Sequence, residues 1–343
     1  MMAAPDMRVE RWTRRAQGFV VSLLLLALVL AFGPLLFSAG ITDRLSELFV
    51  YVMLAVTWNL LAGYGGLVSV GQQAFFGLGA YLAVRLSAAG VSVYPALLLA
   101  GLMTGALALA IGEVMLRLEG GEFAIGMWVV AELAHLLVNL DPLVQGETGT
   151  SLIALDAFSA AARRADTYWA AFAAMVLLLV LVFAVLRGRL GTALQAIRDD
   201  EIAAASLGVR VLATKRVVFM LAAGGAALAG ALWLATAITF QPHAYFSVQW
   251  TAYMIFMTLV GGLGTFEGPV IGAVLFFTVE WLFGASGVWY LIGLGAAALG
   301  FALFAPRGLW GAFTERFPER LLPLGYHVVG ARAAAAAGGG EER

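Results

Sequence analysis

Long apolar segments alternate with short polar ones along almost the whole chain of 343 residues. A helix that crosses a bilayer needs about 20 consecutive, mostly apolar residues, and fewer where the neighbouring structure shortens the path. By this measure we expect ten membrane spans, over residues 18–38, 47–63, 74–87, 93–112, 123–139, 167–186, 216–240, 248–263, 269–284 and 287–304. The pattern predicts an all-α polytopic membrane protein with a transmembrane domain over residues 18–304.

The polar segments complete this organisation. Residues 1–17 form a basic N-terminal segment, and we expect the apolar run that follows to be an uncleaved first helix, because it is longer than the core of a typical secretory signal. Residues 141–166 form an external loop, either a lid or a connector. The tail, 305–343, is low in complexity and is expected to be disordered from Ala331 onward.

Composition places the chain in a lipid bilayer and excludes several kinds of chemistry. Hydrophobic residues make up 62% of the chain, charged residues 12%, and the mean hydropathy is +0.93. The chain has no cysteine and only three histidines, so no thiol site or histidine-rich metal cluster is expected. Its one lysine, Lys215, precedes Arg216 rather than Ser or Thr, so no phosphate-binding glycine loop is present. We expect no catalytic residue, no metal, no cofactor and no nucleic-acid partner.

The distribution of positive charge predicts the orientation, because cytoplasmic loops are enriched in Lys and Arg. With ten spans, all but four of the twenty Lys and Arg residues fall on the side of the N-terminus. The four exceptions are Arg44, Arg85, Arg163 and Arg164. Both termini and the polar segment 187–216 are therefore expected to be cytoplasmic.

The segment 187–216 is dense in charge and lies between two long apolar runs. Thr192 and Gln195 match a capping box, which predicts that a helix begins there. No Gly or Pro interrupts the chain from Ala193 to Leu207, and Gly208 suits a left-handed helix end. The helix either lies solvated on the membrane surface or inserts into a groove on a cytoplasmic subunit.

Several motifs carry a resemblance to a known family. The sequence EIAAASLG over residues 201–208 resembles the EAA-type loop of ABC importer permeases. The wider segment 191–209 is similar to the branched-chain amino-acid permease family, and to its LivM branch in particular. Segments 58–72, 74–81, 116–125, 261–269 and 305–309 agree in order, so the likeness covers about residues 45–310.

The resemblance implies an architecture and partners. It implies the larger, vitamin B12 permease-like class of importer permease, in a bacterial-type inner membrane. It also implies a second permease subunit, identical or homologous, two cytoplasmic ATPases that bind the ATP, and an extracytoplasmic solute-binding protein. In that family the EAA-type loop docks on the ATPase, which assigns ATPase coupling to Arg198, Asp199, Asp200, Glu201, Ala203, Ala204 and Gly208.

The chain also departs from the family pattern at positions that bear on the cargo. Gln73 replaces a usual Ala, and the segment 145–150, QGETGT, replaces a glycine-richer motif. The segment 126–128, GMW, is bulkier than usual. Branched-chain amino acids are the leading cargo, and urea or short amides are the alternative.

Polar and flexible positions inside the spans suggest the cargo path. Glycine permits broken helices, whose free backbone groups can face a polar cargo, although the same residues also serve tight packing. An ionisable group at membrane depth costs about 3 kcal/mol or more, so each one is a functional candidate or part of a satisfied pair. Our path residues are Asn59, Gly63, Gly66, Gln72, Gln73, Glu132 and His135. Glu132 and His135 share a helical face, and as a proton relay they would instead suit a stand-alone secondary transporter.

Overall fold

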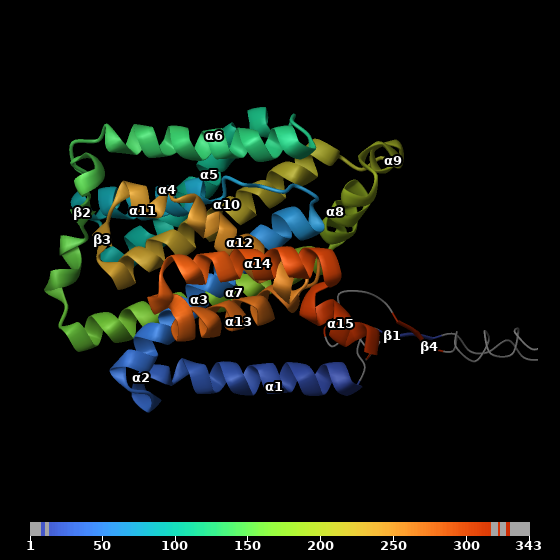
Figure 1. Ribbon diagram of the computed structural model, residues 1–343, viewed down its shortest axis with the longest axis horizontal. Helices are drawn as coiled ribbons and strands as arrows, with labels where there is room; N and C mark the ends of the chain where they lie inside the picture. Colours follow the sequence, from blue (N-terminus) through green and yellow to red (C-terminus); the bar gives the residue numbers. More distant parts are fainter. Residues whose placement is uncertain (1–7, 11–13, 317–321, 323–326, 330–343) are drawn as a thin grey trace, which may run out of the picture.

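The computed structural model describes residues 8–10, 14–316, 322 and 327–329. Almost all of this is helix (Figure 1). The longer helices are α1 (Arg14–Ala31), α3 (Ala39–Asn59), α4 (Gln73–Ala88), α5 (Val93–Met115), α6 (Gly120–Asn139), α7 (Ala160–Arg187), α10 (Val211–Ala237), α12 (Val248–Gly261), α13 (Gly268–Phe283) and α14 (Val288–Phe304). The shorter ones are α2 (Gly33–Leu36), α8 (Arg189–Asp199), α9 (Glu201–Ser206), α11 (Pro242–Tyr245), α15 (Gly308–Arg316), a π-helix, η1 (Leu60–Tyr64), and the 3₁₀ turns η2 (Gly146–Thr148), η3 (Ile153–Ala157) and η4 (Gly284–Ser286).

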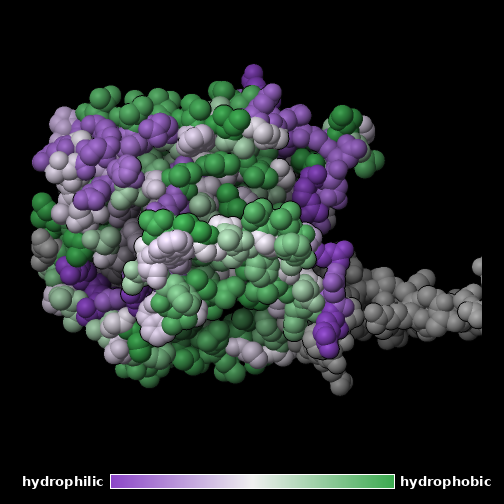
Figure 2. All heavy atoms as spheres, viewed as in Figure 1, coloured by the Kyte–Doolittle hydropathy of each residue, from purple (hydrophilic) through white to green (hydrophobic). Residues whose placement is uncertain are grey.

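Two small antiparallel sheets lie at opposite ends of the bundle (Figure 1). β1 (Arg8–Glu10) pairs with β4 (His327–Val329), which joins the two described chain ends. β2 (Thr150–Ser151) pairs with β3 (Thr239–Phe240), which fastens the segment after α6 to the end of α10. Hydrophilic residues gather toward the two ends and hydrophobic residues cover the middle, as a bilayer-spanning bundle requires (Figure 2).

Seven helices in the described part of the chain are long and apolar enough to cross a membrane. They are Ala39–Tyr64, Val93–Met115, Gly120–Asn139, Ala160–Arg187, Val211–Ala237, Gly268–Ser286 and Val288–Arg316. The other three expected spans are helical but shorter, with α4 and α12 having 16 and 14 residues and α1 an apolar stretch at Ala16–Ala31. The all-α polytopic prediction is confirmed, whereas the number ten stays a prediction.

Several boundaries differ from the sequence prediction; for example, α7 begins at Ala160 rather than at residue 167, and α10 begins at Val211 rather than at residue 216. The first span, expected over 18–38, is interrupted after Ala31, because Pro34 lacks the N–H that a continuing helix needs and starts the separate helix α2. The second, expected over 47–63, already begins at Ala39. Its first turns carry Asp43, Arg44 and Glu47, whose charges suggested a loop but are paired at the helix end.

The helix α10 lies at the centre of the bundle and packs against α3, α4 and α5. Its contact with α4 is a backbone contact. A Cβ on Gly79 would lie 2.0 Å from the carbonyl oxygen of Ala227, and one on Gly230 would lie 2.0 Å from that of Phe76. Small residues let helices in a membrane approach this closely. Part of the glycine-rich region after Asn59 therefore serves packing.

The end of the bundle that carries β1 and β4 also carries α8, α9 and α15 (Figure 1). α15 falls in the segment that we expected to be a low-complexity tail, yet it is helical and packs on α12 and α13. The region from Ala331, expected to be disordered, lies outside the described residues.

Candidate functional site

The polar segment 187–216 folds as two short helices rather than one. The prediction of a single helix capped by Thr192 is wrong, since α8 begins at Arg189 and the Thr192 hydroxyl donates to the Arg189 carbonyl at 2.9 Å. The chain breaks at Asp200, whose backbone is extended and whose carboxylate accepts a 2.9 Å hydrogen bond from the Ala203 N–H. A side chain that caps a new helix offers the backbone an alternative to continuing the old one. Gly208 ends α9 with a φ of 87°, as expected.

α8 lies against the bundle, and α9 projects from it (Figure 1). Leu194 and Ile197 are buried, as their spacing predicts, where α8 packs on α7 and α10. On α9, Ala204 is buried but Ile202 is 81% exposed, and Leu207, just beyond the helix, is 85% exposed.

One ion pair anchors α9 to the bundle. Glu201 accepts a 2.5 Å hydrogen bond from Lys215 of α10, and the lysine side chain is buried. Glu201 is therefore engaged within the chain itself. The exposed apolar side chains of α9 are held in place by this contact.

Arg198, the last arginine of α8, contacts two glycine turns. Its Nη1 donates to the carbonyl oxygen of Gly63 at 2.8 Å, and its Nε and Nη2 donate to Asp199 at 3.2 and 3.1 Å. A Cβ on Gly66 would lie 3.2 Å from Arg198 Cγ, and one on Gly264 would lie 3.2 Å from Nη1. Both glycines have positive φ, 70° and 74°, so both the close approach and the backbone favour glycine there.

Asn59 joins the same two glycine turns to each other. Its Nδ2 donates to the Thr265 carbonyl at 2.7 Å, and its Oδ1 accepts from the Gly264 N–H at 2.8 Å. The side chain is almost fully buried. Of the residues that we assigned to the cargo path, Asn59, Gly63 and Gly66 thus lie together with the coupling residue Arg198. We call this group, Asn59, Gly63, Gly66, Arg198 and Gly264, the glycine junction.

Gln72 and Gln73 are buried at the start of α4. The Gln73 side chain accepts a hydrogen bond from the Thr251 hydroxyl of α12, and its backbone N–H donates to that hydroxyl at 3.3 Å. Gln72 differs, because neither of its amide atoms has a hydrogen-bond partner in the described structure. Leaving such a group unsatisfied costs about 1–3 kcal/mol, so a polar ligand beside Gln72 would be stabilised.

Glu132 and His135 form a third group, at the end of α6 near β2 and β3. His135 lies 3.5 Å from Glu132 and 2.9 Å from Glu147. Asn139 also donates to Glu147, and the His243 backbone N–H donates to its second oxygen at 3.0 Å. Glu147 therefore connects α6 to α11. We call Glu147 with its partners His135, Asn139 and His243 the Glu147 clamp.

Glu147 was not among our site residues, although it lies in the segment 145–150 that departs from the family pattern. That departure was the available signal, because a carboxylate in place of a small residue needs partners. Burial raises its pKa, but the hydrogen bonds from Asn139, His243 and His135 outweigh burial and leave the pKa below its ordinary value.

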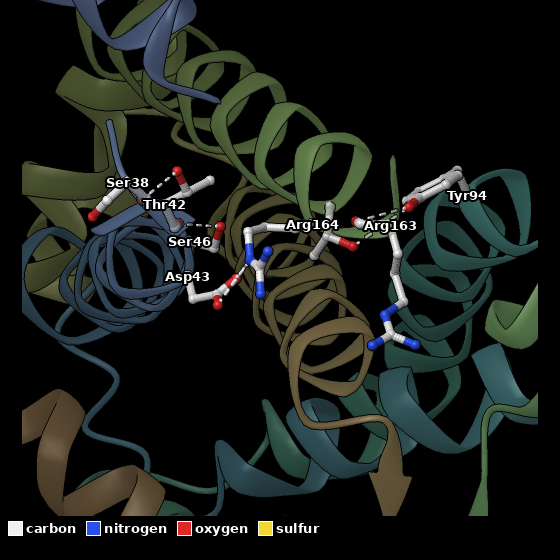
Figure 3. Close-up of polar contacts among 8 residues, drawn as sticks. Ser38, Thr42, Asp43, Ser46, Tyr94, Arg163 and Arg164 are labelled. Atoms are coloured by element: carbon white, nitrogen blue, oxygen red, sulfur yellow. Dashed lines mark hydrogen bonds and ion pairs between the residues drawn. The ribbon is translucent and has the colours of Figure 1, made fainter. Parts of the chain in front are cut away.

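Three of the four arginines expected on the outer side form ion pairs, and the fourth, Arg163, accepts a hydrogen bond at its backbone carbonyl. Figure 3 shows Arg164 of α7 pointing toward Asp43 of α3, with its Nε 2.8 and 3.0 Å from the two carboxylate oxygens. Tyr94 of α5 donates to the Arg163 carbonyl at 3.3 Å (Figure 3). Arg44 pairs with Glu47 at 2.9 Å and Arg85 with Asp141 at 3.1 Å. These contacts hold α3, α5 and α7 together at one end.

The predicted residues thus fall into distinct groups: the glycine junction with α9, the Gln72–Gln73 pair, and Glu132 beside the Glu147 clamp, which contains His135. Among the described residues, no group of three or more His, Cys, Asp and Glu side chains is arranged to hold a metal ion.

Comparison with known proteins gives one family. Residues 40–306 match the model of a family described as branched-chain amino acid transport system / permease component. The chain is 29% identical over 329 residues to the high-affinity branched-chain amino acid transport system permease protein LivM of Escherichia coli K12, covering 88% of this chain and 76% of the relative. It is 28% identical, with the same coverage, to LivM of Salmonella typhimurium LT2. No solved structure matches the chain.

Proposed function

The chain belongs to the family of branched-chain amino acid transport system permease components, and we propose that it forms the membrane path of an ATP-driven importer whose motor docks on α9. The family places the chain among multi-pass inner-membrane transport subunits rather than enzymes. Permeases of this kind work with ATPase subunits and a binding protein. Beyond the family, we propose the docking site of the ATPase, the subunits of the importer and its cargo.

The exposed apolar surface of α9 carries the proposal. Ile202 and Leu207 are among the most exposed large hydrophobic residues of the described chain, and they lie beside charged residues at an end of the bundle. Figure 2 shows hydrophobic atoms over α9 next to hydrophilic ones. Apolar side chains in such a polar setting are stabilised when a partner protein covers them. A groove on an ATPase subunit would cover them here.

The glycine junction then gives docking a mechanical consequence. Force applied to α9 passes to α8, and Arg198 transmits it to the carbonyl of Gly63 at the inner end of α3. Asn59 carries it on to the turn before α13. Asp200 sets the angle between α8 and α9 as a helix cap, and Asp199 orients the Arg198 guanidinium. We therefore assign Asn59, Gly63 and Gly66 to positioning rather than to direct cargo contact.

For the cargo path we retain the remaining polar groups, Gln72, Gln73, Glu132 and His135. The unsatisfied amide of Gln72 is the strongest of them, because a passing polar solute would supply the hydrogen bonds that it lacks. The relatives are named for branched-chain amino acids, which we propose as the cargo. Urea or short amides are the alternative within the family.

The assembly follows from the same reasoning. We propose that α1, α4 and α12 also cross the membrane, which gives ten spans, with the architecture of the vitamin B12 permease-like class. β1 pairs with β4 at the end of the bundle that carries α8 and α9, and the positive charge of these segments supports a cytoplasmic location for both chain ends. A second permease, two ATPases and a binding protein complete the importer.

The test uses the full chain co-expressed with ATPase subunits of a branched-chain amino acid importer. Ile202→Asp should abolish both ATPase co-purification and ATP-dependent uptake, while membrane insertion is unchanged. Ile153→Asp is the matched control, since Ile153 is 72% exposed on the segment after α6. Unchanged uptake in the Ile202 variant would refute docking through α9. Uptake by the chain alone would favour a proton-coupled transporter that uses Glu132 and His135.

A further inference from the structure

Three tyrosines and one glutamate from four helices meet inside the bundle. They are Tyr51 of α3, Tyr253 of α12, Glu280 of α13 and Tyr290 of α14, and we call them the tyrosine–glutamate cluster. The Tyr51 hydroxyl donates to Glu280 at 3.0 Å. Tyr253 and Tyr290 lie close enough to Glu280 to interact with its charge. The three tyrosines are at most 8% exposed.

Glu280 is the charged member of this cluster. Within the described chain, no lysine or arginine forms an ion pair with it. Arg44 and Glu47 both lie close enough to act on the charge of Glu280, but they pair with each other at 2.9 Å. A half-buried carboxylate without an ion-pair partner among the described residues is costly, so a bound cation would stabilise it.

The hydroxyl of Tyr290 has no hydrogen-bond partner in the described structure, although it is buried. The same side chain lines a cavity of about 420 Å³ between α12, α13 and α14. The other lining residues are mostly apolar and include Phe256, Val260, Leu275 and Val279. A ligand in this cavity would meet an aliphatic wall and, at Tyr290, a free hydroxyl.

Aromatic rings continue from the cavity to the carboxylate. Phe276 packs against Tyr51 with ring centroids 5.0 Å apart, against Tyr253 at 4.6 Å and against Phe256 at 5.9 Å. Phe276 and Glu280 are one helical turn apart and so share a face of α13. Ring faces attract cations, and most strongly where water is excluded.

This chemistry selects the class of ligand. A divalent metal prefers several carboxylate or carbonyl oxygens, but the cluster has one carboxylate and otherwise only phenol hydroxyls. A carboxylate with tyrosine rings suits an ammonium group, and the adjoining apolar cavity suits an aliphatic body of modest size. We propose that the cluster and the cavity bind the ammonium end and the aliphatic side chain of a small amine or amino acid. As a cargo site, this deepens the proposed function and rests on it.

The test measures binding to the purified full chain in nanodiscs by saturation-transfer NMR. The three probes share a branched aliphatic body: leucine, isoamylamine, which lacks the carboxylate, and isocaproate, which lacks the amine. Leucine and isoamylamine should bind and compete with each other, and isocaproate should not bind. Glu280→Gln should weaken the binding of isoamylamine by about tenfold or more, which is the effect expected for loss of a charge-assisted hydrogen bond.

Glu280→Gln retains an oxygen that can accept from Tyr51, so the variant should fold. Glu122→Gln is the control, because Glu122 is an exposed carboxylate at the start of α6. Tyr290→Phe should weaken the binding of leucine and of isoamylamine without changing the fold. Binding of isocaproate equal to that of isoamylamine, or no effect of Glu280→Gln, would overturn the proposal.

A lipid tail in the cavity is the competing occupant. Lipid that co-purifies and is not displaced by isoamylamine would also overturn it. These measurements need no ATPase, so their failure is separate from the failure of docking through α9.

Discussion

The guanidinium of Arg198 and the backbone carbonyl of Gly63 are joined by a 2.8 Å hydrogen bond, although 135 positions separate the two residues in the sequence. The bond connects the end of α8 to the π-helical end of α3. An arginine that we assigned to an external partner is thus directed, in part, toward the core of its own chain.

Replacing Arg198 should uncouple transport from docking. Arg198→Ala removes a charge-assisted hydrogen bond worth about 1.5–3 kcal/mol, so we expect ATP-driven uptake to fall about tenfold or more while the ATPase still co-purifies. Uptake into proteoliposomes measures this. Arg316→Ala, at an exposed arginine near the same end of the bundle, should leave uptake unchanged. Loss of ATPase binding in the Arg198 variant would show that the residue docks rather than transmits.

Replacing Asn59 should destabilise the protein. Asn59→Leu keeps the size but leaves the Gly264 N–H and the Thr265 carbonyl without their partner, at about 1–3 kcal/mol each. We expect a clear drop in the melting temperature of the detergent-solubilised protein. Thr104→Val is the control, because the buried Thr104 hydroxyl has no hydrogen-bond partner within the described structure. This variant should have a melting temperature equal to that of the wild type or higher. Equal melting temperatures for the two variants would contradict the role of Asn59.

The Glu147 clamp should make stability depend on pH. The pKa of Glu147 lies below its ordinary value of 4.5 in the folded protein, so the folded state keeps the carboxylate charged to lower pH than the unfolded state does. Its contribution is complete above pH 4.5 and is lost as pH falls through the folded pKa. The melting-temperature difference between wild type and Glu147→Gln should therefore shrink on acidification below pH 4.5. Glu122→Gln serves as the exposed control, and a difference that is constant with pH would refute the prediction.

The contact between α4 and α10 should tolerate no added methyl group. In Gly79→Ala the new Cβ would meet the Ala227 carbonyl, so we expect loss of folded protein or destabilisation by about 1–3 kcal/mol or more. Gly295→Ala is the matched control on α14, where nothing lies within 4 Å, and it should be neutral or stabilising by up to about 1 kcal/mol. Fluorescence-detected size-exclusion chromatography compares the two. A monodisperse Gly79 variant with normal yield would count against the backbone contact.

The helical fold and the family could be predicted from the sequence because long apolar runs and ordered motifs are local signals. The start of α3 could not, because Asp43, Arg44 and Glu47 interrupt the apolar run, and the pairing of Asp43 with Arg164, far along the chain, belongs to the tertiary structure. The break at Asp200 was missed because no Gly or Pro marks it in the sequence, and the burial of Ala204 and the Lys215 contact belong to the tertiary structure.

The candidate site was predictable only in part, because its residues were visible as local features of the sequence but their contacts were not. Glycine-rich turns and the charged segment were visible as separate features, but nothing in the sequence showed that Arg198 lies against Gly66 and Gly264. Asn59 was recognised as a polar residue in a span, and its two backbone partners lie more than two hundred positions away. Glu280 gave no such signal, because Tyr51, whose hydroxyl donates to it, lies more than two hundred positions away in the sequence.

The pairing of β1 with β4 has a consequence for biogenesis. A ribosome makes residues 8–10 near the beginning of synthesis and residues 327–329 only after the last expected membrane helix has been translated. The early strand must wait unpaired throughout elongation, so closure of this ribbon marks the moment at which assembly of the chain is finished.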